Sequence, residues 1–175
     1  MLKQQLEYID KNFGPPSQFI YAVASAPYFA PGKDENDPAK KKWYTERPDV
    51  SVDGICDRLL ARTATSANDN VKAFHALAKQ YNVKSFAYEG GLDLQQFSSN
   101  VDIKMASQYD PRAGRAVEDY LNHWYDGGGD ALFYFTLSCK YSKSGYWGLT
   151  EDVRDLTTPK YQAAARVAEK LRTAP

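Results

Sequence analysis

The chain has few of the residues that build metal and redox sites. Cysteine and histidine occur twice each in 175 residues. No Cys-x-x-Cys spacing occurs, and neither histidine has another His or Cys at a metal-ligand spacing, which argues against a zinc centre. Cys56 lies on an apolar helical pattern, typical of a buried free thiol, and the spacing leaves open whether it pairs with Cys139. The sequence therefore predicts no metal and no cofactor.

The chain also lacks an excess of charge of either sign and any long apolar run. The 22 basic side chains balance 22 acidic ones, so nothing in the composition favours nucleic acid or an anionic membrane surface. No run approaches the ~20 apolar residues of a membrane span, and residues 1–7 do not read as a signal peptide. We expect neither a nucleic-acid nor a membrane partner. Localisation stays open, because an extracellular or periplasmic protein would carry its export signal before residue 1.

Several motifs of common enzyme classes are missing as well. The chain has no Gly-x-Gly-x-x-Gly and no phosphate loop, which argues against nucleotide binding. It has no Gly-x-Ser-x-Gly elbow to support a Ser-His-Asp arrangement. His75 and His123 lie on predicted helices away from the strand ends, and we expect both to be structural or surface residues.

What the chain has is an alternation of helical and strand patterns. Apolar residues at helical spacing predict a first helix over residues 2–13. Continuous apolar runs at 19–24, 85–88 and 131–137 predict strands of a sheet covered on both faces. Further helical stripes are centred on Ile55 and Leu59, Val71 to Tyr81, Pro111 to Trp124, and Pro159 to Leu171, the last two after the capping pairs Asp110-Pro111 and Thr158-Pro159. This order is typical of parallel βαβ units in an α/β fold.

The connections from strand to helix are unusually long. Segments 27–49, 90–109 and 138–157 each have roughly 20 residues where 2–6 are usual, and we expect all three to be loops. They follow the carboxyl ends of the predicted strands, where open α/β sheets and (β/α)8 barrels place their sites. The sequence therefore predicts a site at this end of the sheet.

A single carboxylate stands at the end of the second predicted strand. The segment Phe86-Ala87-Tyr88 leads to Glu89, and Gly90-Gly91 then allows a tight turn with room for a ligand. A carboxylate in this place is either catalytic or a partner for a nearby Lys or Arg.

Aromatic residues lie in the two loops beside this position. If the first two strands are parallel neighbours, Tyr28 lies at the same rim as Glu89 and can hydrogen-bond its carboxylate; the alternative is a packed loop aromatic. Trp147 lies between glycines in Gly145-Tyr146-Trp147-Gly148, where an indole is offered to a ligand more readily than on a helix. Trp124 is on a helical stripe, and we expect it in the core.

These segments resemble a known enzyme family. Phe86-Ala87-Tyr88-Glu89-Gly90-Gly91 resembles the seventh strand of retaining (β/α)8 glycoside hydrolases, which ends in the nucleophilic Glu. Residues 145–152, followed by Thr158-Pro159-Lys160-Tyr161, resemble the closing segment of large glycosidase-like barrel proteins, where the eighth strand leads through a Trp-bearing loop into the last helix. The resemblance covers about residues 15–172.

The resemblance implies both a fold and site residues. It implies one domain, residues 1–175, forming the C-terminal part of a TIM (β/α)8 barrel: the last three βα units with a preceding helix. Glu89 would be the catalytic nucleophile and Tyr28 its hydrogen-bonding partner. Trp147, with Tyr146, would bind the carbohydrate, an oligo- or polysaccharide.

The chain departs from this family in one respect that bears on activity. In the family the general acid/base Glu ends the fourth strand, usually after an Asn, and no such pair occurs here. Retaining hydrolysis needs two carboxyl groups about 5 Å apart. The rim-loop carboxylates are weak substitutes: Asp34, Glu35, Asp37 and Asp93.

We therefore expect little or no hydrolysis of O-glycosidic bonds by this chain alone. Its partner would be the missing N-terminal barrel portion or a second copy. Two alternatives stay open. The chain is a non-catalytic carbohydrate-binding protein, or it is a small stand-alone α/β structural or interaction domain.

Overall fold

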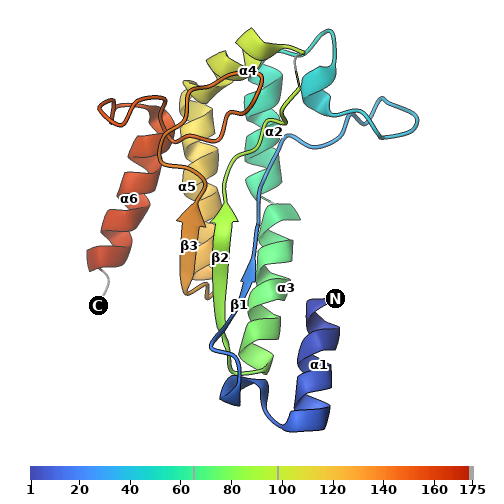
Figure 1. Cartoon of the computed structure of the whole chain (residues 1–175). Helices are drawn as coiled ribbons and strands as arrows, with labels where there is room; N and C mark the ends of the chain where they lie inside the picture. The colour runs from blue at the N-terminus through green and yellow to red at the C-terminus, as the bar shows by residue number, and fades with distance from the viewer. Residues whose placement is uncertain (65, 98, 174–175) are drawn as a thin grey trace.

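The computed structural model describes residues 1–64, 66–97 and 99–173 and shows an α/β fold on a three-stranded parallel sheet (Figure 1). The strands are ordered β1-β2-β3, which confirms the expected class and strand direction. The elements are α1 (Leu2–Phe13), η1 (Pro16–Gln18), β1 (Ala22–Ser25), η2 (Tyr44–Glu46), α2 (Val52–Ala64), α3 (Ser66–Gln80), β2 (Lys84–Gly90), α4 (Val101–Gln108), α5 (Pro111–Asp126), β3 (Ala131–Tyr134) and α6 (Pro159–Thr173).

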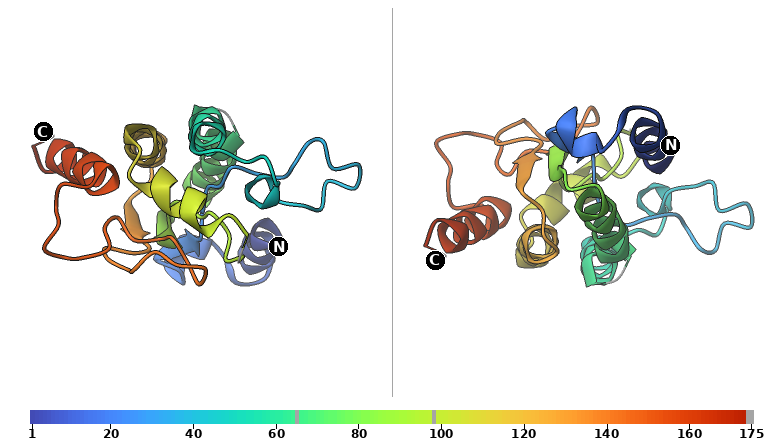
Figure 2. Two further views of the ribbon diagram at one scale, coloured as in Figure 1. Left: turned by 90° about the horizontal axis from the view of Figure 1, so that it is seen from above. Right: turned by 90° about the horizontal axis from the view of Figure 1, so that it is seen from below.

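Helices cover one face of the sheet. Helices α2, α3 and α5 lie behind the strands, and among the described residues no helix lies in front of them (Figures 1 and 2). On the covered face, Ala87 of β2 packs with Val71 of α3 and Trp124 of α5. Trp124 is therefore in the core, as expected. The apolar strands predicted a sheet covered on both faces, and in this structure only one face is covered.

The uncovered side of the sheet, called the open face below, is aromatic. Side chains on it alternate with those that face the helices. Tyr88 and Phe133 are 60% and 64% exposed, and Phe86 contacts Tyr21 edge to face. The open face carries Tyr21, Phe86, Tyr88 and Phe133. Parallel sheets are normally buried on both faces, so this surface is unusual for a sheet of this kind.

Two strands are shorter than the apolar runs predicted. The first begins at Ala22 rather than 19, because the backbone N–H groups of Phe19 and Ile20 donate to Pro16 O and close a turn. The third ends at Tyr134 rather than 137, because the carbonyls of Thr136 and Leu137 accept from the returning residues 149 and 150.

The second long connection is not entirely a loop, contrary to expectation. It contains α4, whose buried side chains are polar: Lys104, Ser107 and Gln108. The Lys104 ammonium donates to the carbonyls of Gln95 and Phe97, and the Gln108 amide donates to Lys104 O. A helix that buries hydrogen-bonded polar groups has no apolar stripe, so hydrophobic periodicity does not detect it.

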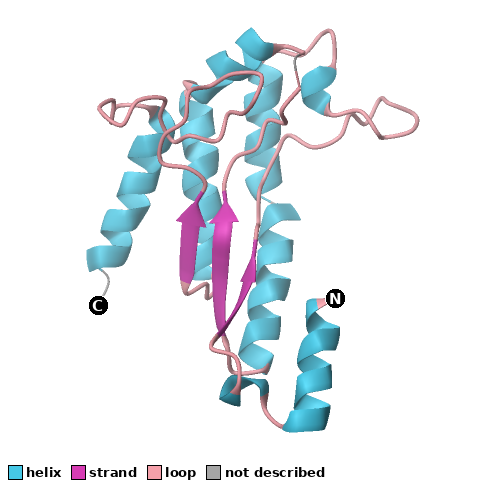
Figure 3. Cartoon of the chain, in the orientation of Figure 1, coloured by secondary structure: helices cyan, strands magenta, loops and turns pink. Residues whose placement is uncertain are grey.

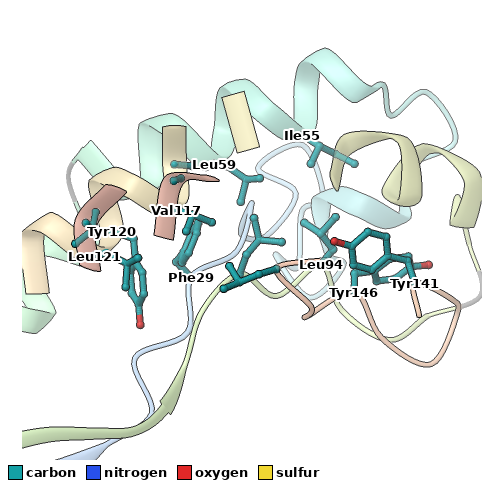
Figure 4. Close-up of a cluster of buried hydrophobic side chains, with 14 of the residues drawn as sticks. Phe29, Ile55, Leu59, Leu94, Val117, Tyr120, Leu121, Tyr141 and Tyr146 are labelled. Atoms are coloured by element: carbon teal, nitrogen blue, oxygen red, sulfur yellow. The ribbon is translucent and has the colours of Figure 1, made fainter. Parts of the chain in front are cut away.

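The largest core cluster lies beyond the carboxyl ends of the strands. The three strand-to-helix connections gather at this end (Figure 3). They supply Phe29, Leu94, Tyr141 and Tyr146, which pack with residues of α2 and α5 (Figure 4). The long loops are thus packed structures that hold the rim of the sheet in place. In the part of the chain that the structure describes, no helix has the length and apolar character to cross a membrane.

Candidate functional site

Tyr28 and Glu89 meet at the carboxyl end of the sheet. Glu89 is the penultimate residue of β2, and Tyr28 follows β1; both side chains are partly buried. The Tyr28 hydroxyl lies close enough to the Glu89 carboxylate for the two groups to interact. Burial, with the nearby carboxylates of Glu89 and Asp93, raises the pKa of Tyr28 to about 12. The phenol therefore keeps its proton at neutral pH and remains a donor.

Backbone pairing beyond the strands brings these two residues together. The Phe29 N–H donates to Gly91 O at 2.9 Å, and the Asp93 N–H donates to Phe29 O at 2.8 Å. Phe29 and Leu92 form an isolated parallel bridge. The loops after β1 and β2 thus run side by side for several residues past the sheet, which places Tyr28 beside Glu89.

A register irregularity occurs where Glu89 lies. The pairing of β2 with β3 is regular at Phe86 and Ala87, then shifts before Gly90 pairs with Tyr134. Such bulges redirect side chains and are frequent near functional sites. Glu89 lies within this irregular segment, at the rim beside Tyr28.

The two glycines after Glu89 admit two tyrosine side chains. A Cβ at Gly90 would lie 2.5 Å from the Tyr120 hydroxyl oxygen, and one at Gly91 would lie 2.7 Å from Cζ of Tyr134. Gly91 also has a positive φ of 143°, which favours glycine. The Tyr134 hydroxyl accepts from the Leu92 N–H at 3.2 Å. Glycine is needed here for close aromatic packing as well as for the turn.

Tyr120 and Tyr134 are site neighbours that the sequence analysis did not single out. Burial raises the pKa of both hydroxyls. The Tyr120 hydroxyl is buried and has no hydrogen-bond partner among the described residues. Both lie where helix or strand patterns predict core aromatics. The sequence signal that could have identified them is the Gly90-Gly91 pair, because two adjacent glycines indicate that other side chains pack closely against the backbone.

Of the four rim carboxylates, Asp93 is the one near the Tyr28–Glu89 pair. Its charge contributes to the raised pKa of Tyr28, and its Oδ1 accepts from the Gln95 N–H at 2.8 Å. The other three lie in the first long loop, where each has a partner of its own. Asp34 pairs with Arg47 at 3.3 Å, Glu35 pairs with Arg58 at 3.5 Å, and Asp37 accepts from the backbone N–H groups of residues 39, 41 and 42.

Trp147 is partly buried beside the end of β3. Its ring meets Phe135 edge to face, with centroids 5.6 Å apart. The Phe135 N–H donates to Gly90 O at 2.8 Å, so Phe135 links the indole to the residue that follows Glu89. A Cβ at Gly145 would lie 2.2 Å from the indole, so this glycine lets the ring fold back over its own turn.

Tyr146 is a core residue rather than the carbohydrate contact that the resemblance implies. It is 1% exposed and belongs to the main core cluster (Figure 4). Its hydroxyl is buried without a hydrogen-bond partner among the described residues. Tyr146 is thus buried while its neighbour Trp147 stays partly exposed, and it has no surface left for a sugar.

The remaining polar candidates have structural surroundings. His75 Nδ1 lies 2.8 Å from the Ser85 hydroxyl, on the covered face of the sheet. Cys56 and Cys139 are both free thiols, and Cys139 Sγ accepts from the Gly148 N–H at 3.1 Å. No group of three or more His, Cys, Asp or Glu side chains within residues 1–64, 66–97 and 99–173 is arranged to hold a metal ion.

The arrangement offers a carboxylate beside a phenol, a nearby second carboxylate and an aromatic surface at one end of a parallel sheet. Comparisons of the chain with protein-family models, curated protein sequences and solved structures gave no match.

Proposed function

We propose that this chain is the C-terminal part of a retaining O-glycoside hydrolase with a (β/α)8 barrel, in which Glu89 is the nucleophile. The observation that carries the proposal is the proximity of the Tyr28 hydroxyl to the Glu89 carboxylate at the carboxyl end of adjacent parallel strands. Parallel α/β enzymes place catalytic groups at this end. The resemblance of the Tyr-Glu-Gly-Gly and Trp-Gly-Leu segments to such enzymes adds independent support.

In this proposal Glu89 attacks the anomeric carbon of the sugar. A bond forms between a carboxylate oxygen and C1 as the bond from C1 to the leaving oxygen breaks, and water later releases the glycosyl group. In the proposed reaction Tyr28 orients the carboxylate by donating a hydrogen bond to it. Trp147 supplies a flat apolar surface for a sugar ring. A second carboxyl group, which protonates the leaving oxygen, comes from outside this chain.

The free edge of β1 supports a partner that completes the barrel. An apolar groove of about 630 Å³ runs along this edge, between β1 and α1. It is lined mainly by Leu2, Leu6, Ile9, Ile20 and Val23. A further parallel strand beside β1 would lie against α1 and fill this groove, and additional strands would cover the open face. In the complete protein that partner is the rest of the barrel.

A covalent trapping experiment tests the nucleophile without requiring the second carboxyl group. Dinitrophenyl 2-deoxy-2-fluoro-glycosides carry a leaving group that departs without protonation, so a general acid is unnecessary for the first step. Incubation of the chain with a panel of these glycosides, followed by intact mass spectrometry, should show one added glycosyl group. Peptide mapping should place it on Glu89, and dinitrophenolate release should match it in stoichiometry.

Three variants make the trapping result specific. Glu89→Gln should give no adduct, whereas Tyr28→Phe should give the adduct more slowly by about tenfold, the effect of one lost orienting interaction of ~1.4 kcal/mol. Asp37→Asn, in the first loop, should react like the unmodified chain. An adduct on another residue, or none with any sugar of the panel, would contradict the proposal.

A carbohydrate-binding protein without catalysis is the second candidate. The exposed aromatic surface favours it, since Phe133, Tyr88 and Phe135 are 64%, 60% and 40% exposed near the rim. Binding of oligosaccharides on an array, abolished by Trp147→Ala and unchanged by Glu89→Gln, together with the absence of trapping, would favour this function over hydrolysis.

A further inference from the structure

Lys160 is a buried cation on the first turn of α6. Its side chain is fully buried, and no ion pair with a carboxylate is formed by it among the described residues. A buried lysine without a counter-charge is rare because desolvation of the ammonium is costly. Such a residue needs compensating hydrogen bonds. The segments that supply the acceptors are the ones that the lysine holds in place.

The partners of Lys160 lie on both sides of Trp147. Its Nζ donates to Tyr146 O at 3.4 Å, to Gly148 O, and to Gln108 Oε1 at 2.6 Å. An ammonium has three N–H donors, and these three acceptors use all of them. Two of the three are the carbonyls that precede and follow Trp147 in the chain.

Other contacts fix the same turn. The Tyr141 hydroxyl donates to Gly148 O at 2.9 Å, and the Gly148 N–H donates to Cys139 Sγ. Gln108 is itself held on α4, where its amide donates to Lys104 O. Lys160 thus connects the Trp147 turn to α6 and α4, two helices that lie outside the turn.

We propose that Lys160 is a positioning residue for Trp147, holding the indole in its ligand-facing orientation through the two flanking carbonyls. The proposal deepens the proposed function, because it assigns the support of the aromatic platform. It does not depend on the identity of the ligand, and its test uses no sugar. Its failure is therefore distinguishable from failure of the proposed function.

A matched control exists in Lys104. This lysine is also fully buried, and its Nζ donates to two carbonyls, Gln95 O and Phe97 O, both at 3.4 Å. These carbonyls belong to the loop after β2. Lys104→Met and Lys160→Met therefore remove the same chemical group from equally buried positions, while only the second removes hydrogen bonds beside Trp147.

Fluorine NMR on protein labelled with 5-fluorotryptophan provides the measurement. The chain has three tryptophans, and Trp147→Phe assigns the signal of interest. In Lys160→Met, the Trp147 resonance should move by more than its linewidth or broaden, while the resonances of Trp43 and Trp124 stay in place. In Lys104→Met, which removes a cation over the Tyr146 ring at 5.7 Å from its centroid, the Trp147 resonance should move less than in Lys160→Met. An unmoved Trp147 signal in Lys160→Met, or equal displacement in both variants, would overturn the proposal.

A measurement on the unmodified chain covers the case in which Lys160→Met does not fold. Burial lowers the pKa of Lys160 to about 7, so deprotonation removes one of its three donors near neutral pH. Cys139 and Glu151 lie close enough to influence this titration, the Tyr141 ring centroid is 4.6 Å from Nζ, and Gln108 faces it from α4. The Trp147 fluorine shift and the Lys160 Cε carbon shift should follow one midpoint. A Trp147 signal that stays constant while Lys160 titrates would contradict the proposal.

Discussion

The Tyr28 hydroxyl lies beside the Glu89 carboxylate at the carboxyl ends of β1 and β2. This contact joins residues 61 positions apart in the sequence, and it depends on the parallel pairing of the loops that follow the two strands. It also makes the charge of Glu89 measurable through the titration of Tyr28.

Replacing Glu89 should lower the pKa of Tyr28. Burial is the largest cause of the raised value of about 12, and the Glu89 charge is the next. In Glu89→Gln the pKa of Tyr28 should therefore fall, yet stay above the ordinary value of about 10 because burial remains. NMR of protein labelled at tyrosine Cζ, with Tyr28→Phe for assignment, measures it. Asp93→Asn should produce a smaller decrease, and an unchanged pKa in Glu89→Gln would contradict the contact.

Replacing Gly91 should destabilise the chain more than replacing Gly128. Both have a positive φ, 143° and 98°, so alanine is strained at either position. A Cβ at Gly91 would meet the Tyr134 ring, whereas a Cβ at Gly128 meets nothing within 4 Å. We expect Gly128→Ala to cost about 1–2 kcal/mol from backbone strain. Gly91→Ala should cost roughly 1–3 kcal/mol more through overpacking. Urea unfolding of both variants measures the difference, and equal losses would count against the close packing of Tyr134.

Lys160 should make stability depend on pH in the alkaline range. Its folded pKa of about 7 lies below the unfolded value of about 10.4. Between these values the unfolded chain binds a proton that the folded chain does not, so the free energy of unfolding rises with pH. The slope approaches ~1.4 kcal/mol per pH unit for one proton and vanishes below pH 7, where both states are protonated.

Lys160→Met should remove this slope between pH 7 and about pH 8, a window that ends before the tyrosines of the unfolded chain titrate and before the Cys56 thiol, whose pKa burial raises in the fold, adds an opposing slope. Lys143→Met serves as the control, because Lys143 is exposed in the loop between β3 and α6 and should leave the slope unchanged. Chemical denaturation at several pH values supplies the free energies. A slope that persists in Lys160→Met would place the titrating group elsewhere.

The open face should promote association of the isolated chain. Tyr88 and Phe133 are 60% and 64% exposed on an aromatic sheet surface, and exposed apolar patches of this kind mark interaction sites. Light scattering should show a mass that rises with concentration, and Tyr88→Ser with Phe133→Ser should shift it toward the monomer. Because both side chains are already exposed, the double variant should lose little stability.

Val153→Ser is the control for this effect, since Val153 is 59% exposed in the third long connection, outside both the open face and the groove beside β1. It should leave the mass unchanged. A stable monomer at all concentrations would favour a stand-alone α/β domain over a barrel portion that requires a partner.

Local patterns in the sequence determined most of the architecture. The apolar stripes predicted α1 and α5, and the Asp110-Pro111 pair predicted the start of α5, where the Asp110 carboxylate accepts from the Arg112 N–H at 2.8 Å. The alternation of helices and strands predicted parallel pairing. These features depend on residues close in the sequence, and apolar burial strongly constrains them.

Tertiary structure alone decided the features that depend on distant partners. Helix α4 buries Lys104 and Gln108, whose hydrogen bonds to other segments replace apolar packing. Tyr146 is drawn into the core while its neighbour Trp147 stays partly exposed. Thr158 precedes α6 as predicted, but its hydroxyl donates to Leu149 O at 2.8 Å. Composition and spacing cannot specify which carbonyl or ring a polar side chain will meet, because that depends on how the long loops pack against the helices.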